Sequence, residues 1–251
     1  MTADDTTSRR LDQLLVTLGH FETRSRAADA VRRGTVSVDG RKAAKPGQTV
    51  APSATITIDD PAHGYVSRAA LKLIAALDHF DLDPAGLHCL DIGASTGGFT
   101  QVLLERGAAH VTAVDVGHGQ LHERIAGHPD VTNLEGLNAR NLSADDIGGR
   151  AVQAVASDVS FISLKLALPP ALSLCQPGGF CVLLVKPQFE AGKQAIGKGG
   201  LLKDPTLGPT IAADIEVWLE GEQGFQSLGV IPSPIAGGDG NQEFLLAGRK
   251  R

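Results

Sequence analysis

Short apolar runs that alternate with helix-like segments are the feature that most constrains the fold of this chain. From residue 87 onward we predict seven strands: Leu87–Ile92, His110–Asp115, Val131–Leu134, Val152–Ser157, Phe180–Lys186, Gln226–Ile231 and Glu243–Ala247. The first five alternate with helices or loops, which indicates a parallel sheet covered on both faces. The last two lie close together in sequence, with proline and glycine between them, as in an antiparallel hairpin at a sheet edge. The expected fold class is α/β, with a doubly wound seven-stranded sheet.

The residues before this sheet form a smaller unit. We predict a small N-terminal α+β domain over residues 8–58, an interdomain linker over residues 59–66 and the larger domain over residues 67–251. Leucines at helical spacing predict a first helix that ends at Gly19, and Ser25 is a suitable N-cap for a second helix. The linker is short and polar, and proline and glycine interrupt it.

The N-terminal domain is basic, although the whole chain is acidic. Residues 8–50 contain nine Lys or Arg and four Asp or Glu, a net charge of +5, whereas the full chain carries −5. Guanidinium groups pair with the phosphates of a nucleic-acid backbone, and such contacts position more than they specify. We therefore predict a nucleic-acid-binding surface, and the alternative is an ordinary solvated charged face. The candidate residues are Arg9, Arg10, Arg24, Arg26, Arg32, Arg33, Lys45 and, after the linker, Arg68.

Other classes of protein lack support in the sequence. The cysteines Cys89, Cys175 and Cys181 have no CxxC spacing and lie in apolar segments, so we expect reduced core cysteines and no metal. The N-terminal sequence MTADDTTSRR lacks the apolar core of a signal peptide. No apolar run reaches the ~20 residues that a membrane helix needs. We expect a cytoplasmic protein with no membrane partner, and the sequence carries no signal for an oligomeric state.

The stretch Leu90–Thr100 predicts a cofactor site. A strand ends at Asp91 and Ile92, a glycine-rich turn follows, and a helix begins near Gly98. Glycines permit a tight turn and let a ligand approach the backbone closely. Asp115 ends the next strand, where its carboxylate can accept both ribose hydroxyls of an adenosine cofactor.

The glycine spacing distinguishes between adenosine cofactors. A dinucleotide site needs G-x-G-x-x-G, whereas this chain has Gly93 followed by Gly97 and Gly98. Asp91 would repel a pyrophosphate but suits the cationic S-adenosyl-L-methionine. We predict that cofactor rather than a nicotinamide, and a purely structural turn is the remaining alternative. The predicted cofactor-binding residues are Asp91, Gly93, Ser95, Thr96, Gly97, Gly98, Phe99, Asp115, Val116 and, after the third strand, Asn138.

Four charged residues are expected to meet at one edge of the sheet. Lys72 lies on a helix predicted over residues 67–80, Asp158 follows the fourth strand, Lys186 ends the fifth, and Glu243 opens the last. The antiparallel last strand begins where the parallel strands end. A ribose hydroxyl needs a base or electrostatic help as it attacks a methyl group in line, and this cluster suits that task. The alternative for each residue alone is an ordinary solvated charge.

The N-terminal sequence RLDQLLVTLGHFETRSRAADAVRRGTVSVDGRKAAKPG resembles a known RNA-binding domain. This alpha-L domain occurs in a ribosomal small-subunit protein, in pseudouridine synthases and in a tyrosyl-tRNA synthetase. The resemblance covers about 50 residues and implies structured RNA as the partner. The matching features are Arg10-Leu11-Asp12, Ser25-Arg26, Gly34, Val36-Ser37-Val38-Asp39-Gly40 and Lys45-Pro46-Gly47.

The larger domain carries a second resemblance. Lys72, Asp158, Lys186 and Glu243 match the K-D-K-E tetrad of the heat-shock ribose 2'-O-methyltransferases (RrmJ/FtsJ). From Arg9 to Gly248 the chain is similar to the TlyA family of ribosomal RNA methyltransferases, also called hemolysin A. The match is carried by Val66-Ser67-Arg68, CLDIGASTGGFT, VTAVDVGHGQL, SDVSFISL, LVKPQFEAGK and GNQEF.

The second resemblance implies a doubly wound methyltransferase sheet and a specific reaction. This reaction is transfer of a methyl group from S-adenosyl-L-methionine to a cytidine 2'-hydroxyl of ribosomal RNA, in small or large ribosomal subunits or both. Which nucleotide is modified, and which tetrad lysine acts as the base, are left open. One departure is Tyr65, because some members have Trp in the linker at that place, which puts linker-mediated cofactor control in doubt.

Two other functions fit parts of the pattern. A base methyltransferase would show an Asn-Pro-Pro-Tyr-type motif after the fourth strand or paired catalytic cysteines, and the sequence has neither. An RNA-binding or membrane-lytic protein with a vestigial cofactor fold would fit the hemolysin name, but no amphipathic membrane helix or signal supports lysis. We therefore predict an enzyme, an S-adenosyl-L-methionine-dependent ribosomal RNA (cytidine-2'-O)-methyltransferase.

Overall fold

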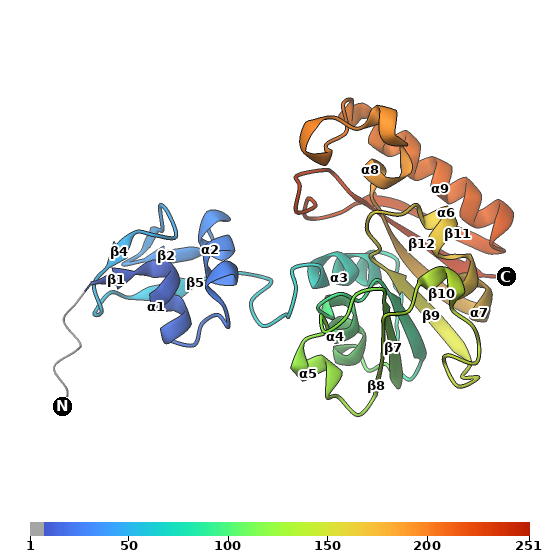
Figure 1. The fold of residues 1–251 in the computed structure, drawn as a ribbon, viewed down its shortest axis with the longest axis horizontal. Helices are drawn as coiled ribbons and strands as arrows, with labels where there is room; N and C mark the ends of the chain where they lie inside the picture. Colours follow the sequence, from blue (N-terminus) through green and yellow to red (C-terminus); the bar gives the residue numbers. More distant parts are fainter. Residues whose placement is uncertain (1–7) are drawn as a thin grey trace. The chain divides into compact units, whose positions relative to one another are not determined.

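The chain divides into two units, with the boundary between His63 and Gly64 (Figure 1). The computed structural model describes residues 8–251, so most of the segment considered for a signal peptide lies outside the described residues. The predicted linker is shared between the units. Its last residues belong to the larger unit, because the Gln101 side chain accepts a hydrogen bond from Val66 N at 2.8 Å and donates one to the Gly64 carbonyl oxygen at 3.1 Å.

A seven-stranded sheet forms the centre of the larger unit, in the order β11-β12-β10-β9-β6-β7-β8. Five neighbouring strands are parallel, namely β10, β9, β6, β7 and β8. Strand β12 is antiparallel to β10, and β11 is antiparallel to β12. This confirms the predicted doubly wound sheet that ends in a hairpin. The strands are β6 His88–Ile92, β7 His110–Asp115, β8 Val131–Glu135, β9 Val152–Ser157, β10 Cys175–Val185, β11 Phe225–Pro232 and β12 Phe244–Lys250.

Helices cover both faces of this sheet (Figure 1). Side chains of α3 and α4 pack on one face, and side chains of α6, α7 and α9 pack on the other. Within residues 8–251, no helix is long and apolar enough to cross a lipid bilayer. The helices are α3 Ala70–His79, α4 Gly98–Glu105, α5 Glu123–Ala126, α6 Leu164–Ala167, α7 Pro169–Leu174, α8 Pro187–Glu190 and α9 Gly208–Glu222, with short 3-10 turns η1 Ala139–Asn141, η2 Lys193–Ala195, η3 Lys198–Gly200 and η4 Pro205–Leu207.

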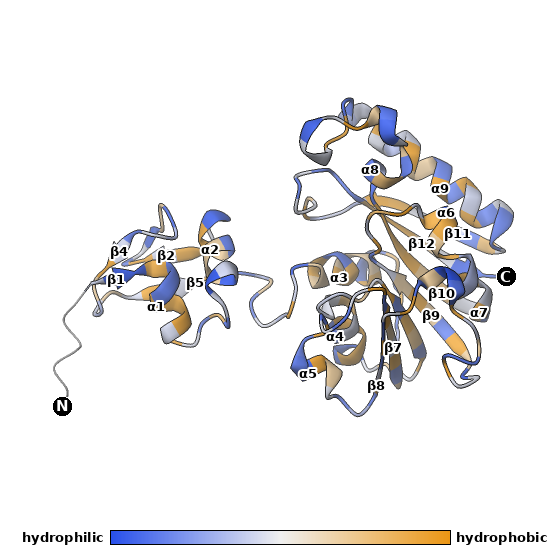
Figure 2. Ribbon diagram, viewed as in Figure 1, coloured by the Kyte–Doolittle hydropathy of each residue, from blue (hydrophilic) through white to orange (hydrophobic). Residues whose placement is uncertain are grey.

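Strand β10 shows why an uninterrupted apolar run becomes a central strand. Alternate residues of a strand point to opposite faces, and both faces of this sheet are covered. Phe180, Val182 and Leu184 belong to the core beneath α3 and α4, whereas Leu183 and Val185 belong to the core on the other face. Figure 2 shows the hydrophobic residues concentrated along these central strands. The three cysteines are buried and free, as the sequence predicts.

Several predicted boundaries were wrong by a few residues. Strand β10 begins at Cys175 rather than Phe180, with an irregularity in its pairing between these residues. It ends at Val185, because Pro187 has no N–H for the ladder and instead occupies the first turn of α8. Lys186 is therefore the residue that links strand and helix. Glu243 likewise precedes β12 rather than opening it.

The smaller unit packs two helices against short strands. Its helices are α1 Leu11–Thr17 and α2 Arg24–Arg32, and its strands are β1 Arg9–Arg10, β2 Val36–Val38, β3 Arg41–Lys42, β4 Thr49–Val50 and β5 Ile56–Ile58. The predicted N-cap was wrong, because the side chain of Thr23, not Ser25, accepts the hydrogen bond from Arg26 N. Asp39 and Gly40 have φ angles of 49° and 76°, as a tight turn between β2 and β3 requires.

Candidate active site

The turn after β6 needs glycine for two separate reasons. Gly93 and Gly97 have φ angles of +83° and +94°, which side chains rarely adopt. A Cβ atom at Gly93 would also lie 3.0 Å from the backbone of Asp158 and Val159, so this turn and the end of β9 are in close contact. Ser95 has a φ angle of 47° without being glycine, and such strain tends to concentrate at functional sites.

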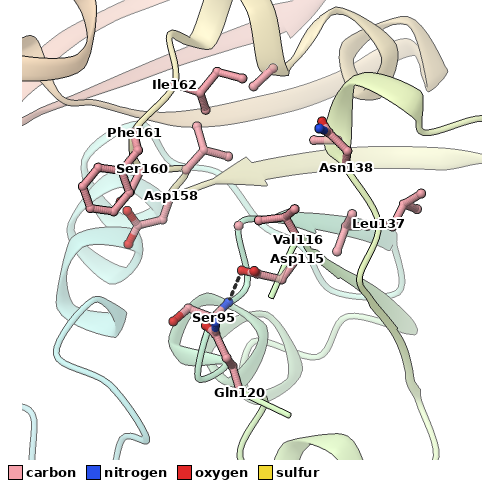
Figure 3. Close-up of a pocket in the computed structure, with 15 residues that line it drawn as sticks. Ser95, Asp115, Val116, Gln120, Leu137, Asn138, Asp158, Ser160, Phe161 and Ile162 are labelled. Atoms are coloured by element: carbon pink, nitrogen blue, oxygen red, sulfur yellow. Dashed lines mark hydrogen bonds between the residues drawn. The ribbon is translucent and has the colours of Figure 1, made fainter. Parts of the chain in front are cut away.

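Asp115 connects the turn after β6 to the end of β7. Its Oδ2 accepts a hydrogen bond from Ser95 N at 2.8 Å, drawn in Figure 3, and its Oδ1 accepts one from Gly117 N at 2.7 Å. An ionised carboxylate has about four lone-pair sites, so these bonds leave acceptor capacity for ligand hydroxyls. The geometry therefore agrees with the role predicted for Asp115.

A cavity of about 440 Å³ opens beside this carboxylate (Figure 3). Its volume lies within the range of about 300–1,000 Å³ that is usual for ligand pockets. The predicted cofactor residues among its lining are Gly93, Ser95, Asp115, Val116 and Asn138. The sequence analysis missed other lining residues, namely Val114, Gln120, Leu137, Ala139, Val159, Ser160, Phe161, Ile162 and Ala167. Asp158 also lines this cavity.

The other predicted cofactor residues lie elsewhere. Thr96, Gly98 and Phe99 line a smaller neighbouring cavity of about 140 Å³, together with Ser67, Ser160 and Lys186. Gly97 lines neither cavity, because the position of its missing Cβ faces Leu121 and Ile125 at 2.8 and 3.1 Å. It is therefore a packing residue of the turn.

Asp91 lies beneath the turn rather than on a cavity wall. It is fully buried, and its Oδ2 accepts a hydrogen bond from Thr100 Oγ1 at 2.6 Å. Its Oδ1 is buried without a hydrogen-bond partner. Burial raises the pKa of this carboxyl to about 7, and the Thr100 hydroxyl opposes the rise. Asp91, which the sequence predicted to bind the cofactor, therefore lines neither of the two cavities beside the turn.

The four charged residues of the predicted cluster converge as two ion pairs. Lys72 Nζ lies 2.5 Å from Glu243 Oε2, and Lys186 Nζ lies 2.6 Å from Asp158 Oδ1. All four line one cavity of about 410 Å³, which we call the catalytic cavity. The side chains of Lys72, Glu243 and Lys186 are less than one-tenth exposed. Burial raises the pKa of Glu243, and the charge of Lys72 opposes this shift.

Ser160 and Phe161 are among the residues of the catalytic cavity that sequence reasoning missed; the others are Gln188, Phe189, Ile196, Gly199, Gly200, Gly238 and Asp239. Ser160 Oγ accepts a hydrogen bond from Lys186 Nζ at 2.6 Å. Phe161 has a φ angle of 66°, is 90% exposed, and packs on Phe189 with ring centroids 5.1 Å apart. The only signal in the sequence was their position directly after Asp158, where loop residues of a doubly wound sheet face the ligand.

The predicted RNA-binding residues are distributed over both units, and several already have carboxylate partners. Arg10 and Arg24 both bind Asp12, at 2.9 and 3.1 Å, and Arg26 pairs with Glu22 at 3.3 Å. The Arg10 side chain holds the pKa of Asp12 down to about 2. Arg9, Arg32 and Lys45 are exposed in the smaller unit, and Arg68 is half-buried in the larger one.

Arg33 differs from the other arginines. Its guanidinium binds Asp60 at 2.6 Å and Asp29 at 2.8 Å, and the Asp60 side chain is only 2% exposed. This pair attaches the end of the unit to α2 and keeps the pKa of Asp60 below its usual value. Arg33 is thus engaged in holding the smaller unit together, which argues against a primary role on its surface.

Comparison with known proteins shows the family to which this chain belongs. Residues 65–250 match the FtsJ-like methyltransferase family, and residues 9–56 match the S4 domain family. A Mycobacterium tuberculosis protein named 16S/23S rRNA (cytidine-2'-O)-methyltransferase TlyA is 44% identical over 94% of this chain and 88% of the relative. The chain belongs to the TlyA family.

Other TlyA relatives carry the hemolysin name. Hemolysin A of Brachyspira hyodysenteriae is 36% identical over 94% of this chain and 98% of the relative. A solved structure from Streptococcus thermophilus, also with a hemolysin name, is 38% identical, with a TM-score of 0.75 over 98% of this chain and 89% of that chain. TlyA membership confirms the predicted methyltransferase class.

Within residues 8–251 no group of three or more His, Cys, Asp or Glu side chains is placed to hold a metal ion.

Proposed function

We propose that this chain transfers a methyl group from S-adenosyl-L-methionine to the 2'-hydroxyl of a cytidine in ribosomal RNA. The observation that carries the proposal is the convergence of the two ion pairs, Lys72–Glu243 and Lys186–Asp158, on one cavity beside the glycine-rich turn. The names of the TlyA relatives supply the nucleotide and the class of RNA.

The residues around the turn fit this cofactor. Asp115 has acceptor capacity for ribose hydroxyls, and Asn138 lines the same cavity, where an amide suits an adenine edge. The unpartnered Oδ1 of Asp91 places negative potential beneath the turn, which favours a cationic ligand over a pyrophosphate. When bound, the cofactor supplies an electrophilic methyl group on sulfur.

We assign the contact with the ribose hydroxyl to Lys186. It lines both the catalytic cavity and the small cavity at the turn, whereas Lys72 lines the catalytic cavity but not the small one. In its neutral form, Lys186 Nζ would accept the proton of the ribose hydroxyl as that oxygen attacks the methyl group that the bound cofactor would supply. Asp158 and the Lys72–Glu243 pair hold this amine in place and compensate the charge that it gains.

The smaller unit is the part that would recognise RNA. It matches the S4 domain family and exposes Arg9, Arg32 and Lys45, which fit contacts to phosphates. Because the substrate of this reaction is ribosomal RNA, we propose that the enzyme acts on ribosomal subunits in the cytoplasm.

Methylation of purified ribosomal subunits tests the proposal. The chain is incubated with small and large subunits that lack the modification and with radiolabelled S-adenosyl-L-methionine, and the labelled nucleotide is located by mass spectrometry. We expect a methyl group on a cytidine ribose, which makes the following phosphodiester resistant to alkali. A methyl group on a base would contradict the reaction, and failure to bind the cofactor in calorimetry would favour a vestigial cofactor fold.

A further inference from the structure

Ser160 lies where three cavities of the larger unit meet. It follows β9 in residues 158–163 and is exposed. It lines the cavity of about 440 Å³ beside Asp115, the small cavity at the turn and the catalytic cavity. We propose that Ser160 is a positioning residue whose hydroxyl aims the amine of Lys186 at the ribose 2'-hydroxyl. This inference rests on the function proposed above and extends it beyond the four charged residues.

The contacts of Lys186 show what the hydroxyl adds. Lys186 Nζ donates to Ser160 Oγ at 2.6 Å and to the carbonyl oxygen of Asp158 at 3.4 Å. Its 2.6 Å contact with Asp158 Oδ1 is an ion pair that lacks the alignment of a hydrogen bond. A charge attraction depends weakly on angle, whereas a hydrogen bond prefers a nearly linear arrangement. Of these contacts, the one to Ser160 is therefore both short and directional.

The segment that carries Ser160 is fixed at both ends. Asp158 N donates to the Ile92 carbonyl oxygen at 3.0 Å, next to the cofactor turn. At the other end, the Glu190 carboxylate accepts hydrogen bonds from Ser163 Oγ at 2.5 Å and Leu164 N at 2.8 Å. The position of the hydroxyl is thus determined by the same elements that form the cofactor turn and the catalytic cavity.

The left-handed backbone conformation of Phe161, the residue after Ser160, also bears on the position of this segment. A φ angle of 66° is unfavourable for a phenylalanine and persists only where the surroundings impose it. The Phe161 ring contacts the ring of Phe189 on α8, and α8 begins directly after Lys186. The two partners of the Lys186–Ser160 hydrogen bond therefore lie on segments that pack against each other.

Proton transfer makes the direction of the amine important. A neutral amine has one lone pair and two N–H bonds, and it accepts a proton only along that lone pair. If Ser160 Oγ and the Asp158 carbonyl oxygen accept the two N–H bonds, the lone pair is left for the substrate. A displacement of about 1 Å in such a geometry is sufficient to lower a rate about 100-fold. Loss of the hydroxyl should therefore affect the chemical step and spare the binding of both substrates.

Three substitutions of Ser160 test this role. Ser160→Ala removes the acceptor, Ser160→Thr retains it, and Ser160→Cys keeps nearly the same size with a much weaker acceptor. Ser160 is exposed, so none of these changes opens a core cavity. We expect Ser160→Ala and Ser160→Cys to lower the single-turnover methylation rate about 10- to 100-fold. The Kd for S-adenosyl-L-methionine and the KM for ribosomal subunits should stay within about twofold of wild type, and Ser160→Thr should recover most of the rate.

Ser173→Ala is the matched control. Ser173 is an exposed serine on α7 that lines none of these three cavities, so its substitution should leave the rate unchanged. An unchanged single-turnover rate in Ser160→Ala would overturn the proposal. A raised KM with an unchanged kcat would overturn it as well, because that result indicates that Ser160 binds substrate rather than positions Lys186.

A measurement without turnover separates this inference from the proposed function. Acetylation of the whole protein by acetic anhydride, followed by peptide mass mapping, gives the reactivity of Lys186 relative to Lys72. Loss of the Ser160 acceptor should increase that ratio in Ser160→Ala and leave it unchanged in Ser160→Thr. An equal ratio in wild type and Ser160→Ala would refute the contact. A wild-type protein that methylates no ribose would refute the proposed function even if the ratio changes.

Discussion

The two units pair their positive charges with carboxylates in different environments. In the S4-type unit, Arg10 and Arg24 share Asp12, and their side chains are 50% and 55% exposed. In the catalytic cluster, Lys72 and Lys186 also have acidic partners, but their side chains are only 8% and 9% exposed. Both arrangements hold cations in place, so the difference lies in how accessible each cation is from solvent.

Exposure determines that access. Asp12 is buried, with its side chain 6% exposed, but the two guanidinium groups that share it are about half exposed, so a phosphate can bind them without displacing Asp12. Breaking a buried pair by removing one partner costs about 3–5 kcal/mol, because the other charge stays buried and uncompensated. The first arrangement suits an RNA surface that must meet varied phosphates. The second suits a reaction centre in which the amine must not move.

Lys186→Met is expected to have the largest effect. It removes the proposed base and retains a side chain of similar length, so the single-turnover methylation rate should fall by at least about 1,000-fold. The Kd for S-adenosyl-L-methionine, measured by calorimetry, should stay near that of wild type. Near-normal turnover would eliminate the role that we assign to Lys186.

Lys72→Met tests the buried arrangement through stability. Since Glu243 would remain buried without its partner, we expect a loss of about 3–5 kcal/mol in the free energy of unfolding, measured in urea. The double variant with Glu243→Gln should recover part of this loss. Arg106→Ala is the control, because Arg106 and Asp78 form an exposed pair and should contribute less than about 1 kcal/mol. Equal losses in the two single variants would contradict the comparison.

The sequence predicted the sheet and the convergence of the charged residues, because both follow from strand topology. Apolar runs define the strands, and the carboxyl ends of parallel strands must share one edge. The prediction failed where structure depends on individual side-chain contacts that strand topology does not determine. Arg33 and Asp60 are 27 residues apart, and Ser160 and Lys186 are 26 apart. Side-chain pairs of this kind depend on loop geometry, for which periodicity carries no signal.

Asp91 illustrates a different limit. Its place before the glycine turn was evident from the sequence. Its burial was not, because the depth of a strand end below a turn depends on how the following helix packs over it. In the structure, the hydroxyl of Thr100 on that helix donates a hydrogen bond to Asp91.

Arg10→Ala and Arg24→Ala test the exposed arrangement. Each should weaken binding to ribosomal subunits and reduce the slope of log K against log salt by about one, provided that the arginine contacts a phosphate in the complex. Arg33→Ala should instead lower the stability of the S4-type unit, because Asp60 would lose its partner, and should leave the salt slope unchanged. If all three variants reduced the slope equally, exposure would not distinguish RNA-binding from structural arginines in this unit.

The smallest expected effect concerns a single proton on Asp91. With a pKa of about 7, this carboxyl is about half protonated at neutral pH. A cationic cofactor above it would favour the ionised form, so binding should release up to about half a proton at pH 7. Calorimetry in two buffers with different ionisation enthalpies measures this release. Asp91→Asn should abolish it, and equal binding enthalpies in both buffers for wild type would show that Asp91 does not respond to the ligand.

The same pKa fixes the direction of a pH dependence in the cofactor-free protein. Because the pKa of Asp91 is raised on folding, its contribution to stability is complete below about pH 4 and is lost as the pH rises through about 7. Asp91→Asn should therefore make the unfolding free energy less dependent on pH in this range. A charge that destabilises the cofactor-free protein and is relieved by a cationic ligand would couple folding to cofactor binding, whereas the Asp12 carboxylate of the S4-type unit is already compensated by Arg10 and Arg24.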